Sequence, residues 1–406
     1  MTKPVLLMLL SRHPYAEKSG RGAMLRQRIE QARLRFEPRI LAFGSPAGDD
    51  SDRDITFLPM ASPLSIALNA ARLPRFPLQT WLYHSAALRR RIAAIARESR
   101  AAAVYVDMLR LAPLVRDLPD GIAEIVDYDD LLSERYAQAA GQDYDVMGFL
   151  ARRVGPLAGL ARAVSRPLLR SEAARCAAYE RDMLARADLV LFTSPLEAAR
   201  MPRMRARVLA APPLVAAQAE TPPPGRRLIF LGNIRYGENV LMLRALAAAA
   251  EALAREGAWP ADAAIDVVGD HAPELPAEFD AAKFKFTGRA ADLSVLAGAG
   301  VFLAPVRSGS GVKLKVLDGM ALGCPVVGTA KALEGLAARP NRDVLVARDP
   351  TGVLRAALAL RDRETLKAML ARNARAYVTR QHAPEIGAAV AEAMIAAVGR
   401  VRQETL

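Results

Sequence analysis

The residues best suited to bind an anion lie near position 310. A Gly-Ser-Gly turn at Gly309–Gly311 precedes a predicted helix at Val312–Leu322, whose first two turns contain Lys313, Lys315 and Asp318. Glycines let backbone N–H groups approach a ligand, and a helix N-terminus offers unpaired N–H donors with partial positive charge. Lysines there oppose the helix dipole, and a bound anion would offset that cost. The segment predicts a diphosphate site in which Asp318 accepts hydrogen bonds from ribose hydroxyls; a surface loop with ordinary lysines is the alternative.

Other strand patterns of the second half end in residues that suit the same site. Gly232 and Asn233 follow one apolar run, Gly269 follows the next, and Arg289 comes shortly after a third. Ligands of doubly wound sheets bind beyond the carboxyl ends of the strands, so we expect these residues near the diphosphate. Arg235 adds a cation after the first of the three runs.

The first half offers fewer candidates. His13 follows the first apolar run and is placed for substrate contact or proton handling, although a loop histidine without such a role is the alternative. Asp107 and Asp127 end two further strand patterns. Gly20 and Gly22 would let their loop approach phosphates across a cleft, or they belong to an ordinary flexible loop.

An Asp-x-Asp pattern raises the question of a metal. It occurs in Asp127–Asp130 and again in Asp143–Asp145. Hard carboxylates at this spacing can share a divalent ion, but so short a pattern is common by chance. Acceptor binding by this stretch, or helix capping by Asp129 or Asp130, is preferred, and no metal site is predicted.

Apolar runs alternate with amphipathic stretches along the chain. Continuous apolar runs suit strands of a parallel sheet covered on both faces. Those of the first half are Val5–Leu10, Ile40–Phe43, Thr56–Pro59, Val104–Asp107, Glu124–Asp127 and Leu189–Thr193, with helices at Ala23–Arg35, Leu78–Arg97 and Ser171–Ala187. Those of the second half are Leu228–Leu231, Ile265–Val268, Phe284–Thr287, Val301–Pro305, Val326–Thr329 and Val344–Ala347, with helices at Asn239–Glu256, Val312–Leu322 and from about Thr365 onward. The alternation predicts an α/β fold of two Rossmann-like, doubly wound domains.

Prolines separate the two halves. Ala210–Pro213 and Thr221–Gly225 contain prolines that neither a helix nor a central strand accommodates. We expect a first domain over 1–211, a linker over 212–226 and a second domain over 227–378, facing each other across a cleft. The helix over 379–406 has no following strand and is expected to return and brace the first domain.

Composition excludes several classes of protein. A chain of 406 residues with 52% apolar residues is globular and too long for one ordinary core. It contains no apolar run long enough to span a membrane, and its first run is too short for a secretion signal. Cys176 and Cys324 cannot form a disulfide framework or a four-ligand zinc site, which favours a reducing compartment. P-loop, zinc-protease and nucleophile-elbow motifs are absent.

His271 follows a strand end near the anion site, whereas His84 and His382 are predicted on helix surfaces.

The net charge of +13 comes mainly from arginine. Arg72–Arg100 contains seven arginines and one acidic residue, and Arg152–Arg186 contains eight and three. Such stretches suit an anionic membrane surface, and an Arg-rich solvated surface is the alternative. Aromatic residues make up only 5%, and no helix-turn-helix or zinc-finger pattern occurs, so no nucleic-acid partner is expected.

The second half resembles the GT-B glycosyltransferases of family 4, the glycosyl transferases group 1 family. Asn239 opens a helix at the expected place, and the Gly-Ser-Gly-x-Lys-x-Lys pattern is typical of a subgroup. The first half is similar more loosely, at Ser11–Gly22 and Asp182–Thr193. The matching segments of the second half follow the family's order and are Phe230–Asn233, Val267–Asp270, Phe286–Arg289 and Ala304–Thr329.

The resemblance implies a nucleotide-sugar donor in the second domain, an acceptor in the first, and transfer with retention of configuration. The family signature has two glutamates eight positions apart; here Asp318 stands at the second position and Ser310 at the first. Arg235 matches the family's arginine after the first strand of the donor domain, and no lysine follows it. We therefore expect Lys313 or Lys315 to supply that charge.

Catalysis would need cations and N–H dipoles around the departing nucleoside diphosphate rather than a protein nucleophile. Arg235, Lys313 and Lys315 are the expected catalytic residues, without a metal or a bound cofactor. His13, Asp107 and Asp127 are expected to bind the acceptor. The expected donor-binding residues are Gly20, Gly22, Gly232, Asn233, Gly269, Arg289, Gly309, Ser310, Gly311, Val312 and Asp318.

The expected function is a hexosyltransferase-type enzyme of bacterial polysaccharide or glycoconjugate biosynthesis. Its partners would be a nucleotide-sugar, a glycan or lipid-linked acceptor, and an anionic membrane surface. We expect a cytoplasmic protein, with peripheral attachment to the inner face of the membrane as a hypothesis. The alternatives are a nucleotide-sugar epimerase of the same architecture, and an inactive donor-binding relic or partner subunit, which Ser310 keeps open.

Overall fold

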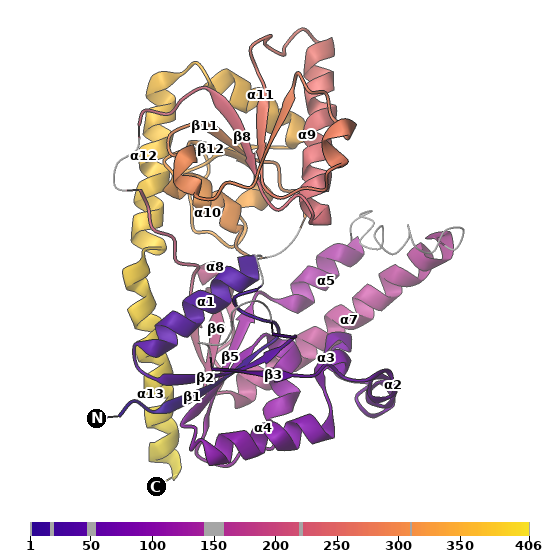
Figure 1. The fold of residues 1–406 in the computed structure, drawn as a ribbon, viewed down its shortest axis with the longest axis vertical. Helices are drawn as coiled ribbons and strands as arrows, with labels where there is room; N and C mark the ends of the chain where they lie inside the picture. Colours follow the sequence, from indigo (N-terminus) through magenta and orange to yellow (C-terminus); the bar gives the residue numbers. More distant parts are fainter. Residues whose placement is uncertain are drawn as a thin grey trace. The chain divides into compact units, whose positions relative to one another are not determined.

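The computed structural model of the chain describes residues 2–16, 20–46, 54–141, 158–218, 222–308 and 311–405. The chain divides into two compact units: unit 1 comprises Met1–Pro213 and Glu385–Leu406, and unit 2 comprises Leu214–Pro384. Each unit is built on a parallel sheet with helices on its faces (Figure 1). This confirms the predicted fold class of two doubly wound α/β domains. Gly309, Ser310 and the second Asp-x-Asp pattern at 143–145 lie outside the described residues.

The described part of unit 1 has seven parallel strands in the order β3-β2-β1-β4-β5-β6-β7. Six of them match predicted apolar runs. The seventh, β7, escaped prediction because it is a four-residue edge strand with no fully buried side chain. The strands are β1 (Val5–Leu10), β2 (Glu37–Phe43), β3 (Ile55–Leu58), β4 (Ala103–Asp107), β5 (Ala123–Asp129), β6 (Leu189–Phe192) and β7 (Arg207–Ala210).

Alternate side chains of the unit 1 strands pack on opposite faces of the sheet. Leu7 and Leu9 belong to the core formed with α4 (Ala86–Glu98) and α7 (Ala158–Arg186). The neighbouring side chains of β1 belong to the core formed with α1 (Gly20–Arg33) and α13 (Gly387–Thr405). Because α13 comes from the end of the chain, it closes unit 1 in the way expected of the last helix, and Figure 1 shows it running beside the sheet.

One helix predicted in unit 1 is in fact two. The stretch Leu78–Arg97 forms α3 (Leu78–Tyr83) and α4, because Ser85 is extended and its Oγ accepts a hydrogen bond from Leu88 N at 3.1 Å. His84 lies in this break rather than on a helix surface, with Nδ1 3.4 Å from Asn69 Oδ1. Other helices in the described part of unit 1 include α2 (Pro63–Arg72), α5 (Leu132–Gly141), α8 (Pro195–Arg200) and the 3-10 helix η1 (Leu109–Val115).

The described part of unit 2 has six parallel strands in the order β10-β9-β8-β11-β12-β13 around one apolar core. His382, predicted on a helix surface, is buried at the end of α12, where Nε2 lies 3.2 Å from the Tyr377 hydroxyl. The strands are β8 (Arg227–Leu231), β9 (Ile265–Val268), β10 (Phe284–Gly288), β11 (Gly300–Ala304), β12 (Val326–Thr329) and β13 (Leu345–Ala347). The α-helices are α9 (Gly237–Arg255), α10 (Leu314–Ala321), α11 (Pro350–Leu360) and α12 (Glu364–Gln381).

Candidate functional site

Strand order reverses in unit 2 between β8 and β11. The helix after β8 is α9 and the helix after β11 is α10, so the connections lead away from this point in opposite directions. Open α/β sheets bind ligands outside the carboxyl ends of the strands at such a switch point. Two helix N-termini meet there, and each contributes unpaired N–H groups and partial positive charge. The arrangement suits an anion.

Lys315 and Asn239 join the two helices at this point. Lys315 Nζ donates a hydrogen bond to Asn239 Oδ1 and lies 5.3 Å from the centroid of the Phe230 ring. Burial lowers the pKa of Lys315 to about 8; Glu238 opposes the shift and Lys313 adds to it. Lys315 is therefore a half-buried ammonium at the carboxyl edge of the sheet.

Asn239 organises the same edge from α9. Its side chain is 8% exposed, and Nδ2 donates to Asn233 O at 2.8 Å. In the sequence Asn239 is recognisable only as the residue that opens a helix, because its partner Lys315 is 76 positions away. No local pattern could have revealed that contact.

The expected glycines pack the strand ends together. Gly269 has φ +145°, and a Cβ there would lie 1.7 Å from Gly232 O, so no other residue fits without moving the backbone. A Cβ on Gly232 would lie 3.0 Å from the Asn239 amide. These glycines let the ends of β8 and β9 approach each other, a packing role that the sequence alone did not separate from ligand approach.

The loop before α10 turns its lysine inward. Lys313 precedes the helix, and its Nζ donates to Gly311 O at 2.7 Å and lies 3.9 Å from Glu334 Oε2. Gly335, with φ +83°, backs this loop: a Cβ there would lie 3.1 Å from Val312 N. Val312 is half-buried.

Asp318 lies in the middle of α10. Burial raises the pKa of this half-buried carboxyl to about 6. Arg235 and Arg289 are exposed beyond the ends of β8 and β10, and Arg235 N donates to Asn233 Oδ1 at 3.0 Å. Because β8 and β10 flank β9, both arginines stand on the edge that carries Lys315. The described edge therefore presents cations from several strand ends.

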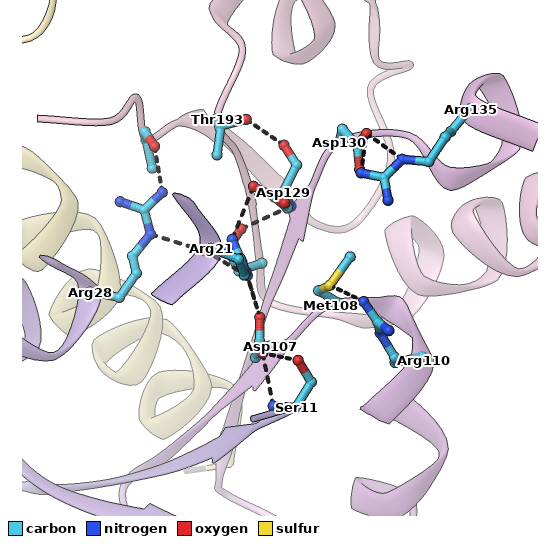
Figure 2. A network of polar contacts seen from close by, with 12 residues as sticks. Ser11, Arg21, Arg28, Asp107, Met108, Arg110, Asp129, Asp130, Arg135 and Thr193 are labelled. Carbon is cyan, nitrogen blue, oxygen red and sulfur yellow. Dashed lines mark hydrogen bonds and ion pairs between the residues drawn. The ribbon is translucent and has the colours of Figure 1, made fainter. Parts of the chain in front are cut away.

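Unit 1 has its own polar network at the carboxyl edge of its sheet. Figure 2 shows Arg21 between the carboxylates that end β4 and β5. Its Nε donates to Asp107 Oδ1 at 3.0 Å, and Nη1 lies 3.0 Å from Asp129 Oδ1. Ser11 fixes Asp107 through N–H at 2.8 Å and Oγ at 2.5 Å. Arg21 is one of 48 arginines, and no local pattern in the sequence predicts its role here.

Asp107 and Asp127 are fully buried in this network. Arg28, also fully buried, donates through Nε to Asp127 Oδ2 at 3.0 Å, and the Tyr105 hydroxyl donates to the same atom at 2.6 Å. Burial alone would raise the pKa of both carboxyls, but the arginine partners and hydrogen bonds hold it below the usual range. Both carboxylates, expected to bind an acceptor, are instead occupied by arginines that fix α1 to the sheet.

Asp129 is the carboxylate of this network that reaches the surface, with its side chain 23% exposed. Its φ is +64°, and the β5–β6 register shifts between Asp127 and Asp129. Thr193 holds its carbonyl oxygen through N–H at 3.1 Å and Oγ1 at 2.6 Å. Burial raises the pKa of Asp129 to about 6, with Arg21 opposing and Asp130 adding to the shift. Strained backbone of this kind is concentrated at functional sites.

The Asp-x-Asp pattern at 127–129 serves these ion pairs. Asp127 faces Arg28, Asp129 faces Arg21, and Asp130 accepts from Arg135. Among the described residues, no group of three or more His, Cys, Asp and Glu side chains could hold a metal ion.

The remaining candidates of unit 1 lie near the first strand. His13 is buried, its Nδ1 accepts from Tyr15 N and Ala16 N at 3.2 Å each, and its ring lies 5.3 Å from the Phe57 ring. Gly20 and Gly22 belong to the first turn of α1 and not to a loop.

No helix in the described residues has the length and apolar character needed to cross a membrane.

Comparisons with known proteins agree with this architecture. Residues 225–363 match the model of the family described as glycosyl transferases group 1. No curated protein matches the chain.

Many solved structures are similar over nearly the whole chain. A glycosyltransferase from Rickettsia africae shares 12% identity at a TM-score of 0.59, covering 99% of both chains. Sucrose-phosphate synthase from Thermosynechococcus elongatus shares 15% identity at a TM-score of 0.59, covering 98% of both. Anabaena HepE, determined with UDP, shares 13% identity at a TM-score of 0.58, covering 97% of this chain and 100% of its own. At such identities the likeness establishes the fold, that of the GT-B glycosyltransferases.

Proposed function

We propose that this chain is a glycosyltransferase that moves a sugar from a nucleotide-sugar donor to a glycan or lipid-linked acceptor. The observation that carries the proposal is the switch point of unit 2, where Lys315 lies between the N-termini of α9 and α10. The family match over 225–363 covers this site, and a structural neighbour was determined with UDP.

In the proposed donor complex the diphosphate lies at the ends of β8 and β11. Lys315, Arg235 and Arg289 neutralise its charge, and the N–H group of Gly311 adds a hydrogen bond. Lys313 adds a further positive charge once its Nζ gives up the hydrogen bond to Gly311 O. Asp318 accepts hydrogen bonds from the ribose.

Departure of the nucleoside diphosphate develops negative charge on the phosphate oxygens. Cations and N–H dipoles held in place before the reaction stabilise that charge without reorganising, and this is the main catalytic contribution we assign to unit 2. We propose transfer with retention, without a metal or a cofactor. The acceptor is bound by unit 1, where Asp129 and His13 offer polar groups at the carboxyl edge of the sheet.

Thermal unfolding in the presence of UDP, GDP, ADP, TDP or CDP, with and without Mg²⁺, tests the donor site. A ligand that binds only the folded protein raises the midpoint, so one diphosphate should do so without the metal. K315A should remove that increase, whereas K285A, which changes an exposed lysine of β10, should keep it. An increase that needs Mg²⁺, or one that K315A leaves intact, contradicts the proposed site.

Turnover separates the enzyme from its alternatives. A glycosyltransferase releases the nucleoside diphosphate in step with glycosylation of an added acceptor, and the anomeric configuration of the product reports retention. An epimerase would change the sugar while it stays on the nucleotide, and an inactive relic would bind the diphosphate without turnover.

A further inference from the structure

Helix α2 carries an apolar stripe on its outer face. Leu64 is 72% exposed and Leu68 is 42% exposed, and Ala67 and Ala71 are exposed at the spacing that places them on the same face. A surface helix of a globular protein ordinarily turns such a stripe toward the core. The outward orientation of this apolar stripe therefore requires an explanation.

The inner face of α2 is held by a polar residue. Asn69 is 7% exposed, and its Nδ2 donates to Trp81 O at 3.0 Å and to His84 O at 2.7 Å. These bonds fix α2 to α3 and to the turn after it. The two hydrogen bonds of the Asn69 side chain therefore fix the orientation of α2.

Two more exposed apolar side chains lie beside α2, one in the segment before it and one on α3. Met60 is 49% exposed and Leu82 is 40% exposed, and Ala61 N donates to Leu82 O at 2.9 Å, which brings the two segments together. Figure 1 shows α2 at the outer edge of unit 1, beyond α3. We call Met60, Leu64, Ala67, Leu68, Ala71 and Leu82 the α2 surface.

The charged side chains on α2 and in the turn after it are arginines. The stretch 60–82 contains two arginines and no acidic residue. Arg72, in the last turn of α2, and Arg75, just after it, are exposed. Exposed leucines rimmed by arginines suit a bilayer interface, where apolar side chains enter the acyl boundary and guanidinium groups bind lipid phosphates.

We propose that the α2 surface inserts into an anionic lipid bilayer and attaches the protein to it peripherally. The positive rim selects an anionic partner, and the apolar stripe selects one that accepts leucines without a preformed pocket. The proposal does not depend on the nucleotide site, because every residue that carries it lies in unit 1 between 60 and 82.

Co-sedimentation with vesicles made of equal parts phosphatidylcholine and phosphatidylglycerol tests this insertion. The wild type should bind these vesicles and not pure phosphatidylcholine. L64S/L68S should weaken binding about tenfold or more, because two leucines no longer leave water. The control L196S/L241S changes leucines exposed to 47% and 43% on other helices and should bind like the wild type.

The electrostatic part is tested by charge reversal. R72E/R75E should weaken binding and reduce its salt dependence, whereas R363E/R372E, which makes the same change in net charge in unit 2, should leave binding almost unchanged. If both pairs weaken binding equally, attraction by the net charge of the protein replaces the α2 surface as the explanation.

The fluorescence of Trp81 can report vesicle binding. The chain has one other tryptophan, Trp259, which can be replaced. In W259F, emission from Trp81 should shift to the blue on vesicle binding and be quenched by brominated lipid. Wild-type protein that ignores anionic vesicles, or that binds without this shift, overturns the proposal. Self-association that L64S/L68S abolishes, without vesicle binding, would assign the surface to a second copy of the chain. Diphosphate binding measured on the same variants shows separately whether the donor site is intact.

Discussion

Lys315 places a titrating ammonium at the switch point of unit 2. Burial lowers its pKa to about 8, so the side chain is charged below that pH and loses its charge as the pH rises through it. An ordinary lysine would stay charged to about pH 10. We predict that diphosphate affinity falls as the pH rises from about 7 to 9, by tenfold or more at full deprotonation, because a charge-assisted contact is lost. Isothermal titration calorimetry across that range measures the change.

The K315R variant is the matched control for this pH effect. A guanidinium stays charged throughout the range, so the variant should bind with nearly constant affinity, and any change that remains belongs to the diphosphate. K315M should bind weakly at every pH. Equal pH profiles for the wild type and K315R would show that Lys315 does not contact the ligand.

Also at the scale of residues, the sequence predicted which residue types gather at a site better than it predicted which residues contact each other. The Gly-Ser-Gly turn and its two lysines stand out because glycines and cations gather within a few positions. Asn239 and Arg21 do not, because each acts through partners 76 and 86 positions away. Asp107 and Asp127 were assigned to an acceptor for the same reason, since a strand-end aspartate looks alike whether it meets a ligand or a buried arginine.

At the scale of elements, α1 is fixed to its sheet by a buried ion pair. Arg28 and Asp127 are both fully buried, and Arg28 Nη2 also donates to the carbonyl oxygen of Ala211. We predict that R28A lowers the free energy of unfolding of unit 1 by about 3–5 kcal/mol, because Asp127 keeps its buried charge without the arginine that hydrogen-bonds to it. Urea unfolding measures this loss.

Arg33 supplies the comparison on the same helix. It pairs with Glu30 at 2.5 Å, but the two side chains are 51% and 64% exposed. R33A should therefore change the stability by less than about 1 kcal/mol. A loss in R28A no larger than that in R33A would mean that Arg21, 3.8 Å away, and the hydrogen bonds from Tyr105 and the backbone suffice to hold Asp127.

The elements that the sequence predicted are those whose burial is uniform. Strands such as β1 and β11 read as continuous apolar runs because both of their faces are covered. The edge strand β7 lacks that pattern, and α2 reverses it by exposing its leucines. The break between α3 and α4 depends on a serine cap, which propensity alone does not distinguish from a helical serine.

At the scale of the whole molecule, the chain completes unit 1 only with its last helix. Met394 of α13 is fully buried in the core shared with β1 and α1. We predict that M394K destabilises unit 1, because a lysine would have to bury its charge or displace the helix. Lys315, Asn239 and Asp318 all lie in unit 2, whose core contains no part of α13, so diphosphate binding should remain. Calorimetry with and without the diphosphate should show one transition lowered by the mutation and another raised by the ligand.

M369K is the control for M394K, because Met369 lies on α12 and is 37% exposed. A lysine there can keep its ammonium in water, so both transitions should stay near their wild-type midpoints. If M394K lowered both transitions together, or abolished diphosphate binding, the two units would unfold as one cooperative block. The boundary at 384–385 would then separate two sets of internal contacts but not two units that unfold independently.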